Sequence, residues 1–198
     1  FVPGGAQKRV HELGTRLADR GHEVTVYGRH FWPGPRERDY EGLTLRAVAP
    51  ERDLYVDDRR SIREAVGFSS ALWRPLRRHR EQHDVVDASV FPYFPVVSAW
   101  AATSRSDVPL VTTWHECWRD YWRDYLGPAG FGGVAVERLV AGLPQYPVAV
   151  SGVTADRLAG IGPSRDRIRV VPNGVDLDAI RAVEPAPDGF DVLFAGRL

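Results

Sequence analysis

The 198-residue sequence contains no methionine, a single cysteine, Cys117, and a single lysine, Lys8. One cysteine excludes both an internal disulfide framework and a zinc site built from cysteines. Arginine supplies nearly all of the cationic side chains, and we attribute this to coding bias because no site chemistry requires it throughout a chain. Because methionine is missing even from the first position, we expect the chain to be a fragment or a processed product.

Long apolar runs are also missing. None approaches the roughly 20 residues of a membrane-spanning helix, and no secretory signal opens the chain, so we expect a cytoplasmic protein. The 26 Lys and Arg residues balance 26 Asp and Glu residues. This balance argues against nucleic acid as a partner and against an acidic, solvated tail. Hydrophobic residues at 43% and aromatic residues at 11% instead indicate a folded globular chain with a sizeable core.

The first thirty residues have the pattern of a glycine loop, an amphipathic helix and a buried strand. Gly4 and Gly5 precede a segment in which apolar residues recur at steps of three and four from Val10 to Leu17. The run Glu23–Tyr27 is short, β-branched and bounded, which is typical of a strand. Together these segments make most of a βαβ unit whose first strand would lie before residue 1.

Strands and helices are then expected to alternate along the chain, after a loop over residues 28–42. Strands are predicted at Leu43–Val48, Val85–Ser89, Pro109–Thr113, Tyr146–Ser151 and Ile168–Val171. Helices are predicted from the capping box at Ser61 to about Arg80, and at Pro95–Thr103, Gly133–Leu143 and Thr154–Ile161. Such alternation predicts an α/β fold, a Rossmann-like parallel sheet of about six or seven strands with helices on both faces.

The composition also suggests a domain boundary near the end of the sequence. Residues 184–189 are rich in proline, as a linker is. A new strand is expected at Asp191–Ala195. We therefore divide the chain into a domain over residues 1–183, which lacks its first strand, a linker over 184–189, and the first strand of a second domain over 190–198.

Two positions have a context that suits ligand binding. Gly4 and Gly5, ahead of a helix, would allow free N–H groups to contact an anion, and a tight strand-to-helix turn explains them equally well. His115 directly follows a compact apolar strand. Ligands of doubly wound sheets bind at the carboxyl ends of strands, so His115 is placed for substrate contact, with a capping or core-edge histidine as the alternative.

Four other motifs have structural explanations that we weigh against functional ones. The repeat Trp118–Tyr125 would give a helix an aromatic face, which could stack on a sugar, meet a membrane interface, or pack across a cleft or between domains. The basic run Trp73–Arg80 is a solvated helix end, with anionic lipid or phosphate as the alternative. Asp176 and Asp178 suit a helix start better than a metal. The glycines of Gly130–Ala135 match a dinucleotide fingerprint without the strand that should precede it, which favours a loop before a helix.

In order and content, several strings resemble the N-terminal half of a GT-B-fold retaining glycosyltransferase of family 4. The strings that carry the resemblance are Gly4-Gly5-Ala-Gln7, Val111–His115, Val148–Ser151, Arg169–Asp176 and Leu193–Leu198. The most specific pair is Pro-Asn-Gly-Val-Asp followed by Phe-Ala-Gly-Arg-Leu.

The resemblance implies roles for the matching residues. Gly4 and Gly5 would lie near the donor phosphate, and Gln7 would face the acceptor. His115 would reach the donor sugar near the reacting carbon, as the catalytic residue. Arg197 would pair with the donor diphosphate, which suits a guanidinium group. Three further residues of the matching strings would shape the cleft: Ser151, Asn173 and Gly174.

The resemblance also implies an activity. A sugar would pass from a nucleotide-diphosphate sugar to a carbohydrate or lipid-linked acceptor with retention of configuration. Peripheral contact with a membrane is left open. No cofactor and no divalent metal is expected, because cationic side chains and helix dipoles handle the leaving-group charge in such enzymes. Two alternatives remain, a non-catalytic carbohydrate-binding or acceptor-binding module and a GT-B-like sugar-nucleotide epimerase.

Overall fold

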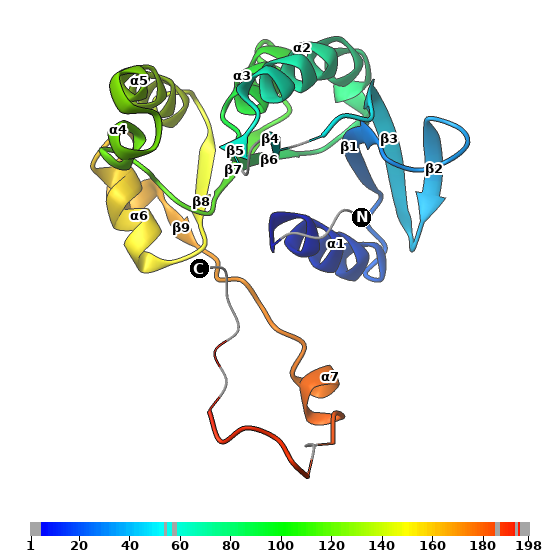
Figure 1. Cartoon of the computed structure of the whole chain (residues 1–198). Coiled ribbons are helices and arrows are strands. Elements are labelled where there is room, and N and C mark those ends of the chain that lie inside the picture. Colours follow the sequence, from blue (N-terminus) through cyan, green and yellow to red (C-terminus); the bar gives the residue numbers. More distant parts are fainter. Residues whose placement is uncertain (1–4, 54, 57–58, 185–186, 193, 195–198) are drawn as a thin grey trace.

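A computed structural model gives the arrangement of the chain (Figure 1) and describes residues 5–53, 55–56, 59–184, 187–192 and 194. Its helices and strands follow in the order α1 (Gly5–Ala18), β1 (Val24–His30), β2 (Glu37–Tyr40), β3 (Leu43–Pro50), β4 (Tyr55–Val56), β5 (Arg59–Arg60), α2 (Ile62–His79), β6 (Val86–Val90), α3 (Phe94–Thr103), β7 (Leu110–Trp114), α4 (Tyr121–Leu126), α5 (Gly130–Ala141), β8 (Tyr146–Ala149), α6 (Gly152–Ala159), β9 (Arg169–Val170) and α7 (Leu177–Arg181).

The strands form two main sheets and a short ribbon of β4 and β5. One sheet has the order β6-β7-β8-β9, and all of its pairs are parallel. The other has the order β1-β3-β2, in which β1 and β3 are parallel and β2 is antiparallel to β3. The predicted α/β class with a Rossmann-like parallel sheet is confirmed. The expectation of one continuous sheet is wrong for the described ranges, because no strand there pairs with both β1 and β6.

Helices cover both faces of these sheets, as expected. In Figure 1, α2 and α3 lie above the sheets and α1 lies below them. Helix α2 packs on β3, α3 packs on β6 and β7, and α1 contacts β1 and β3. The larger core cluster includes the fully buried Trp114 and Leu158, and a second cluster under α2 and α3 includes Leu76 and Leu110. Trp114, at the carboxyl end of β7, is therefore packed in the larger cluster with residues of α3, α5 and α6.

Helix α2 begins where the capping-box spacing predicted. The Ser61 hydroxyl accepts a hydrogen bond of 3.2 Å from the backbone N–H of Glu64, which pairs one of the free donors of the first turn. The helix continues through Pro75 to His79, where three basic residues occupy its last turn. Cations are favoured there by the helix dipole.

The prediction of a loop over residues 28–42 is wrong in two places. Strand β1 continues to His30, and β2 forms a hairpin with β3. The two-residue turn consists of Glu41 and Gly42, both with positive φ, at 49° and 78°. This is the backbone that a tight hairpin requires. The hairpin escaped prediction because the residues of β2 are polar and exposed or half-buried, so they show no apolar alternation.

The glycines at the start of α5 serve close packing. A Cβ atom added at Gly130 would overlap the backbone carbonyl of Trp122, and one added at Gly133 would overlap the Trp122 ring. Side chains at these positions would push α5 away from α4. The prediction of a loop before a helix is wrong for this segment, because Gly130–Ala135 already lies in α5, which begins at Gly130.

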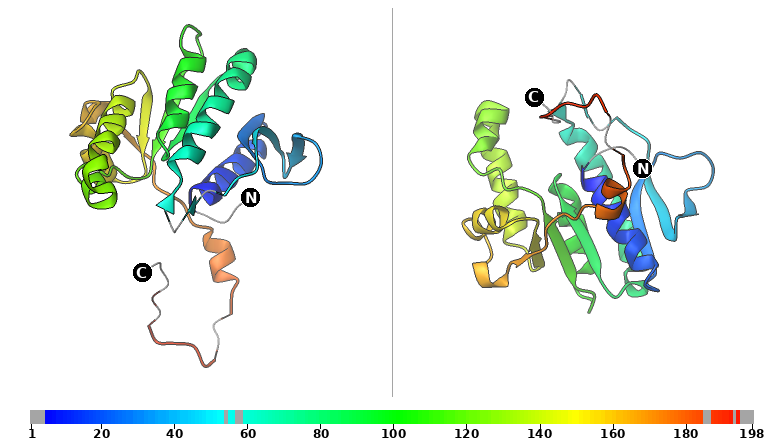
Figure 2. Two further views of the ribbon diagram at one scale, coloured as in Figure 1. Left: turned by 45° about the horizontal axis from the view of Figure 1, so that its top comes forward. Right: turned by 90° about the horizontal axis from the view of Figure 1, so that it is seen from below.

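The segment after β9 extends away from the sheets and carries the short helix α7 (Figure 2). Its apolar side chains are between 53% and 89% exposed: Val175, Leu177, Ile180, Val183, Phe190, Val192 and Phe194. Residues 191, 192 and 194 form no strand, while 193 and 195–198 lie outside the described residues. The division into a domain, a linker and the first strand of a second domain stays a prediction.

Candidate functional site

The carboxyl end of the four-stranded parallel sheet gathers the residues that sequence reasoning singled out. His115 directly follows the last residue of β7, and Asn173 lies three residues after β9. Parallel strands place their carboxyl ends on one edge of the sheet. The side chain of His115 is half-buried, and its backbone carbonyl accepts a hydrogen bond of 3.4 Å from the hydroxyl of Thr154. The histidine therefore stands at the edge where ligands of such sheets bind.

The surroundings of His115 keep its imidazole neutral. Burial lowers the pKa of His115 below its ordinary value, and the positive charge of Arg9 lowers it further. A neutral imidazole donates one hydrogen bond and accepts another. At neutral pH, His115 is thus a polar contact without a charge of its own.

Arg9 is the residue of this edge that sequence reasoning missed. Its guanidinium Nη1 donates to Oδ1 of Asn173 at 2.7 Å and to the backbone carbonyl of Pro172 at 3.3 Å. It stands four residues after Gly5, so it shares the helix face of the glycine at the start of α1. That spacing was the only available signal, and a lone arginine at this spacing is common on solvated helix faces.

A second polar contact lies between β6 and β7. The hydroxyl of Thr113 donates to Oδ1 and Oδ2 of Asp87 at 3.0 and 3.2 Å. Burial raises the pKa of Asp87, while the Thr113 hydroxyl and the positive charge of Arg9 act in the opposite direction. Arg9 is therefore close enough to influence both His115 and Asp87.

The loop that follows His115 is held by a buried carboxylate. Glu137 is fully buried in α5, and its Oε1 accepts from the Tyr93 hydroxyl and from the Trp118 backbone N–H, both at 2.7 Å. Its Oε2 accepts from the backbone N–H of Arg119 at 2.8 Å. Three donors compensate the buried charge, and they fix the backbone three and four residues beyond His115.

Within this loop, Cys117 is buried against Thr154, whose backbone carbonyl lies 4.0 Å from the sulfur. Burial, reinforced by the negative charge of Glu137, raises the pKa of the Cys117 thiol to about 12. Such a thiol is a packing group and not a nucleophile.

The repeated aromatic segment serves packing inside this domain. Trp122 is buried, and Trp118 stacks on Phe91 with the ring centroids 4.9 Å apart. Tyr125 meets Trp118 edge to face at 4.9 Å. Tyr121 alone of the four is exposed, at 54%. The aromatic face predicted to stack on a sugar, meet a membrane or pack between domains is thus mostly used in the core of one domain.

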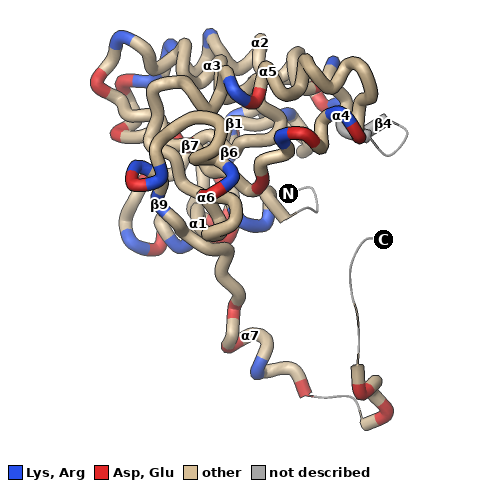
Figure 3. Tube along the Cα trace, turned by 90° about the vertical axis from the view of Figure 1, so that its left-hand side faces the viewer, with Lys and Arg blue, Asp and Glu red and all other residues tan. Residues whose placement is uncertain are grey.

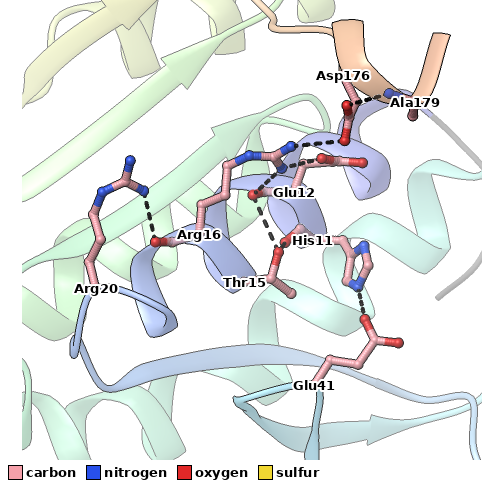
Figure 4. Close-up of polar contacts among 8 residues, drawn as sticks. All are labelled: His11, Glu12, Thr15, Arg16, Arg20, Glu41, Asp176 and Ala179. Carbon is pink, nitrogen blue, oxygen red and sulfur yellow. Dashed lines mark hydrogen bonds and ion pairs between the residues drawn. The ribbon is translucent and has the colours of Figure 1, made fainter. Parts of the chain in front are cut away.

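Helix α1 also contacts the segment that leads to α7 (Figure 4). The Asp176 carboxylate accepts from the Ala179 backbone N–H at 2.9 Å, so it caps α7 as predicted. Its other oxygen lies 3.6 Å from a guanidinium nitrogen of Arg16, which also pairs with Glu12. These are exposed pairs and stabilise the contact weakly.

The remaining predicted site residues lie near this edge or outside the described residues. Gly5 begins α1 and Gln7 is half-buried on it, whereas Gly174 is exposed beside Asn173. Ser151 caps α6, because its hydroxyl accepts from the Thr154 backbone N–H at 3.0 Å. Gly4 and Arg197 are not among the described residues. No described residue tests the roles assigned to these positions.

A hollow of about 660 Å³ lies elsewhere, at the amino ends of β1 and β3. Asp19, Glu23 and Glu41 contribute to its lining. It is open and lies at the end of the strands away from His115, so it is not part of this site.

The chain is similar to a known family and to several curated proteins. A model of Glycosyltransferase Family 4 matches residues 3–179. Among curated relatives, the "D-inositol 3-phosphate glycosyltransferase" of Kineococcus radiotolerans is 29% identical over 98% of this chain and 48% of the relative. Proteins of the same name from Xylanimonas cellulosilytica and Geodermatophilus obscurus are 28% and 29% identical over 98% of this chain and 52% and 46% of their own lengths. The chain spans about half the length of the curated relatives it matches.

Proposed function

Because the chain belongs to Glycosyltransferase Family 4, we propose that the protein containing it transfers a sugar from a nucleotide-diphosphate sugar to an acceptor with retention of configuration. The chain is the N-terminal half of a GT-B fold. The observation that supports the proposal most is a neutral, half-buried His115 at the carboxyl end of β7, beside the cation of Arg9.

Each residue at the carboxyl end of the sheet has its own role in the proposed reaction. His115 donates a hydrogen bond to a hydroxyl of the donor sugar next to the reacting carbon. The backbone N–H groups at the start of α1, at Gly4 and Gly5, face phosphate oxygens, and Gln7 faces the acceptor. Arg197 pairs with the diphosphate and stabilises the charge of the departing nucleoside diphosphate. These cationic and backbone groups supply the charge stabilisation without a divalent metal.

The hydrogen bonds around the loop explain how His115 is held ready. Glu137 fixes the backbone that follows His115, and the Thr154 hydroxyl donates a hydrogen bond to the backbone carbonyl of His115. A loop backbone held in this way gives the His115 side chain a fixed point of attachment, so less ordering is needed when substrate binds.

The names of the relatives suggest which acceptor to test. The relatives carry the name D-inositol 3-phosphate glycosyltransferase, which makes an inositol phosphate the first acceptor to test. A lipid-linked carbohydrate is the second acceptor to test.

The test is an assay of the full-length protein with a panel of nucleotide sugars and both acceptors. We expect release of nucleoside diphosphate that depends on acceptor, and a glycoside whose anomeric configuration, measured by NMR, equals that of the donor. An inverted product would overturn the retaining mechanism. Donor or acceptor binding without turnover would favour a binding module, and interconversion of nucleotide sugars without acceptor would favour an epimerase.

A further inference from the structure

Three aromatic rings lie one after another outward from the edge of the sheet where His115 stands. The last residue of β6 pairs with the last residue of β7, so Phe91 and His115 are the next residues of neighbouring strands. The Phe91 ring stacks on the Trp118 ring with the centroids 4.9 Å apart, and the Tyr121 ring meets Trp118 edge to face at 5.2 Å. We call these three rings the aromatic shelf, which begins beside His115 and ends at the first turn of α4.

The aromatic shelf keeps part of its surface in contact with water. Tyr121 is 54% exposed, and Phe91 and Trp118 are half-buried. A ligand that covers these rings would remove large apolar areas from water, which favours binding. The shelf therefore offers ring surface to a ligand whose reacting end lies at His115.

The backbone that carries the shelf is fixed by the buried carboxylate of Glu137. This carboxylate accepts from the backbone N–H of Trp118 at 2.7 Å and from that of Arg119 at 2.8 Å. Arg119 has a φ of 51°, in the left-handed region that residues with a side chain rarely adopt. The two hydrogen bonds offset the cost of this conformation, so the rings are held in place before a ligand binds.

Charged side chains flank the rings. Within the described part of the chain, the side chains of Glu116, Arg119 and Asp120 are exposed and form no hydrogen bond or ion pair. Figure 3 marks residues of both signs close together where the chain enters α4. Carboxylates accept from hydroxyl groups and a guanidinium donates to them, whereas two carboxylates beside one cation disfavour a phosphorylated ring. The surroundings of the shelf therefore suit an uncharged ligand with many hydroxyl groups.

We propose that the aromatic shelf binds an uncharged sugar ring of the acceptor, the ring next to the one that receives the transferred sugar at His115. This inference rests on the proposed glycosyl transfer and names the class of acceptor, an oligosaccharide of at least two sugars. A pyranose has an apolar face of C–H groups, which packs against an aromatic ring, and a rim of hydroxyl groups, which the flanking charged side chains bind.

The size of the exposed surface favours a sugar over the membrane interface that the sequence left open for this repeat. A helix that lies in an interface buries a broad apolar face. Helix α4 has six residues, and Tyr121 is the single exposed aromatic residue of the repeat. One exposed ring beside two half-buried ones matches the area of one or two sugar rings. Among the described helices, none is long and apolar enough to cross a bilayer.

The first test is saturation-transfer NMR on the full-length protein without donor. The probes are the methyl glycosides of glucose, galactose, mannose, rhamnose and N-acetylglucosamine, and a disaccharide of each sugar. We expect at least one disaccharide to receive saturation on both rings and to bind about tenfold more tightly than its monosaccharide. Tyr121→Ala should weaken the binding of that disaccharide by about tenfold, whereas Tyr121→Phe should retain it, because the ring remains.

The second test is steady-state transfer to the same acceptors. In Tyr121→Ala we expect the KM for the disaccharide to rise by about tenfold, with the KM for the nucleotide sugar as the internal reference. Tyr146→Ala is the matched control, because it removes a ring that is 65% exposed at the start of β8, the opposite edge of the sheet. This control should bind and use the disaccharide as the wild type does.

The two tests separate the aromatic shelf from the proposed transfer. Transfer that is insensitive to Tyr121→Ala, or that uses inositol phosphate and none of the disaccharides, would overturn the shelf and leave the transfer standing. Disaccharide binding that Tyr121→Ala weakens, without transfer from any nucleotide sugar, would support the shelf and overturn the transfer. Binding of none of the disaccharides would overturn the shelf. So would self-association of the wild type that Tyr121→Ala abolishes, because a second copy would then cover the ring.

Discussion

Arg9 and Asn173 stand 164 positions apart in the sequence, and the guanidinium of Arg9 donates a hydrogen bond of 2.7 Å to the side-chain oxygen of Asn173. This bond joins the start of α1 to the segment that leaves β9. Arg9 also lowers the pKa of His115. One cation thus acts both on the proposed catalytic residue and on the connection that leads towards α7.

Replacing Arg9 should change the titration of His115. In Arg9→Gln the positive charge is lost, so we expect the pKa of His115 to rise towards its ordinary value of 6.5 while burial still holds it below that value. Titration of the imidazole proton by NMR measures the change. Arg20→Gln, which removes an exposed cation further along the chain, should leave the titration of His115 unaltered. An unchanged pKa in Arg9→Gln would show that Arg9 does not influence the imidazole.

His115→Ala in the full-length protein should lower turnover far more than stability. Removing one hydrogen bond made in the transition state typically costs about 10²–10³ in rate. His22→Ala, at an exposed position, is the matched control and should keep both properties. Turnover and melting temperature are to be measured on the same preparation. A destabilised His115→Ala variant with near-normal turnover would assign the histidine to the structure instead.

Glu137→Gln should destabilise the fold. In the variant, the amide NH₂ group would face a backbone N–H that donates to a carboxylate oxygen in the wild type. A buried donor without a partner costs about 1–3 kcal/mol. Urea unfolding measures the loss. Glu116→Gln makes the same chemical change at an exposed position of the same loop and should stay within about 0.5 kcal/mol of the wild type. Equal effects of the two changes would contradict the role given to Glu137.

Cys117 should resist alkylation in the folded protein. With a pKa of about 12, only about 10⁻⁴ of this buried thiol is thiolate near pH 8. Labelling with iodoacetamide should be slow in buffer and fast in urea, and because the chain has one cysteine, mass spectrometry reads the result directly. Fast labelling without urea would mean that the loop around Cys117 opens readily.

The stability of the fold should depend on His83 in mildly acidic solution. Its Nε2 lies 2.9 Å from the Tyr27 hydroxyl, which itself accepts from Arg46, so the hydroxyl donates to an unprotonated Nε2. Burial, and then the charge of Arg46, lower the pKa of His83 below 6.5. The unfolded chain therefore binds the proton more readily, and this contribution to stability is complete above the ordinary pKa and lost as the pH falls below it.

His83→Gln provides the measurement. The free energy of unfolding should fall between about pH 7.5 and about pH 5.5 by more in the wild type than in this variant. His22→Gln, at an exposed position, should show the wild-type dependence on pH. If the wild type and His83→Gln lost the same stability over this interval, His83 would not be the group that titrates.

Local signals in the sequence predicted the helices and parallel strands well. The cap at Ser61 and the apolar run Pro109–Thr113 act over a few residues, so they can be read directly from the sequence. The β2 hairpin was not predicted, because its polar strand is held by pairing with β3 and by the positive φ values of Glu41 and Gly42. Pairing of that kind depends on tertiary structure and not on composition.

The site was predicted only where a residue follows a strand. His115 and Asn173 could be placed because strand ends are visible in the sequence, although their roles stay predictions. Glu137 could not, since its donor Tyr93 is 44 residues away and a glutamate in a helix ordinarily faces solvent. Arg9 escaped for a similar reason, because its partner follows a strand at the far end of the chain.

The Trp122 ring packs against Gly133, so the side-chain volumes that these two positions can hold depend on each other. The space that one would need for a side chain is already filled by the other. An engineer who enlarges position 133 has to shrink position 122 at the same time, and a one-residue scan would classify both as intolerant. Only pairs of substitutions can explore other ways of holding α4 against α5.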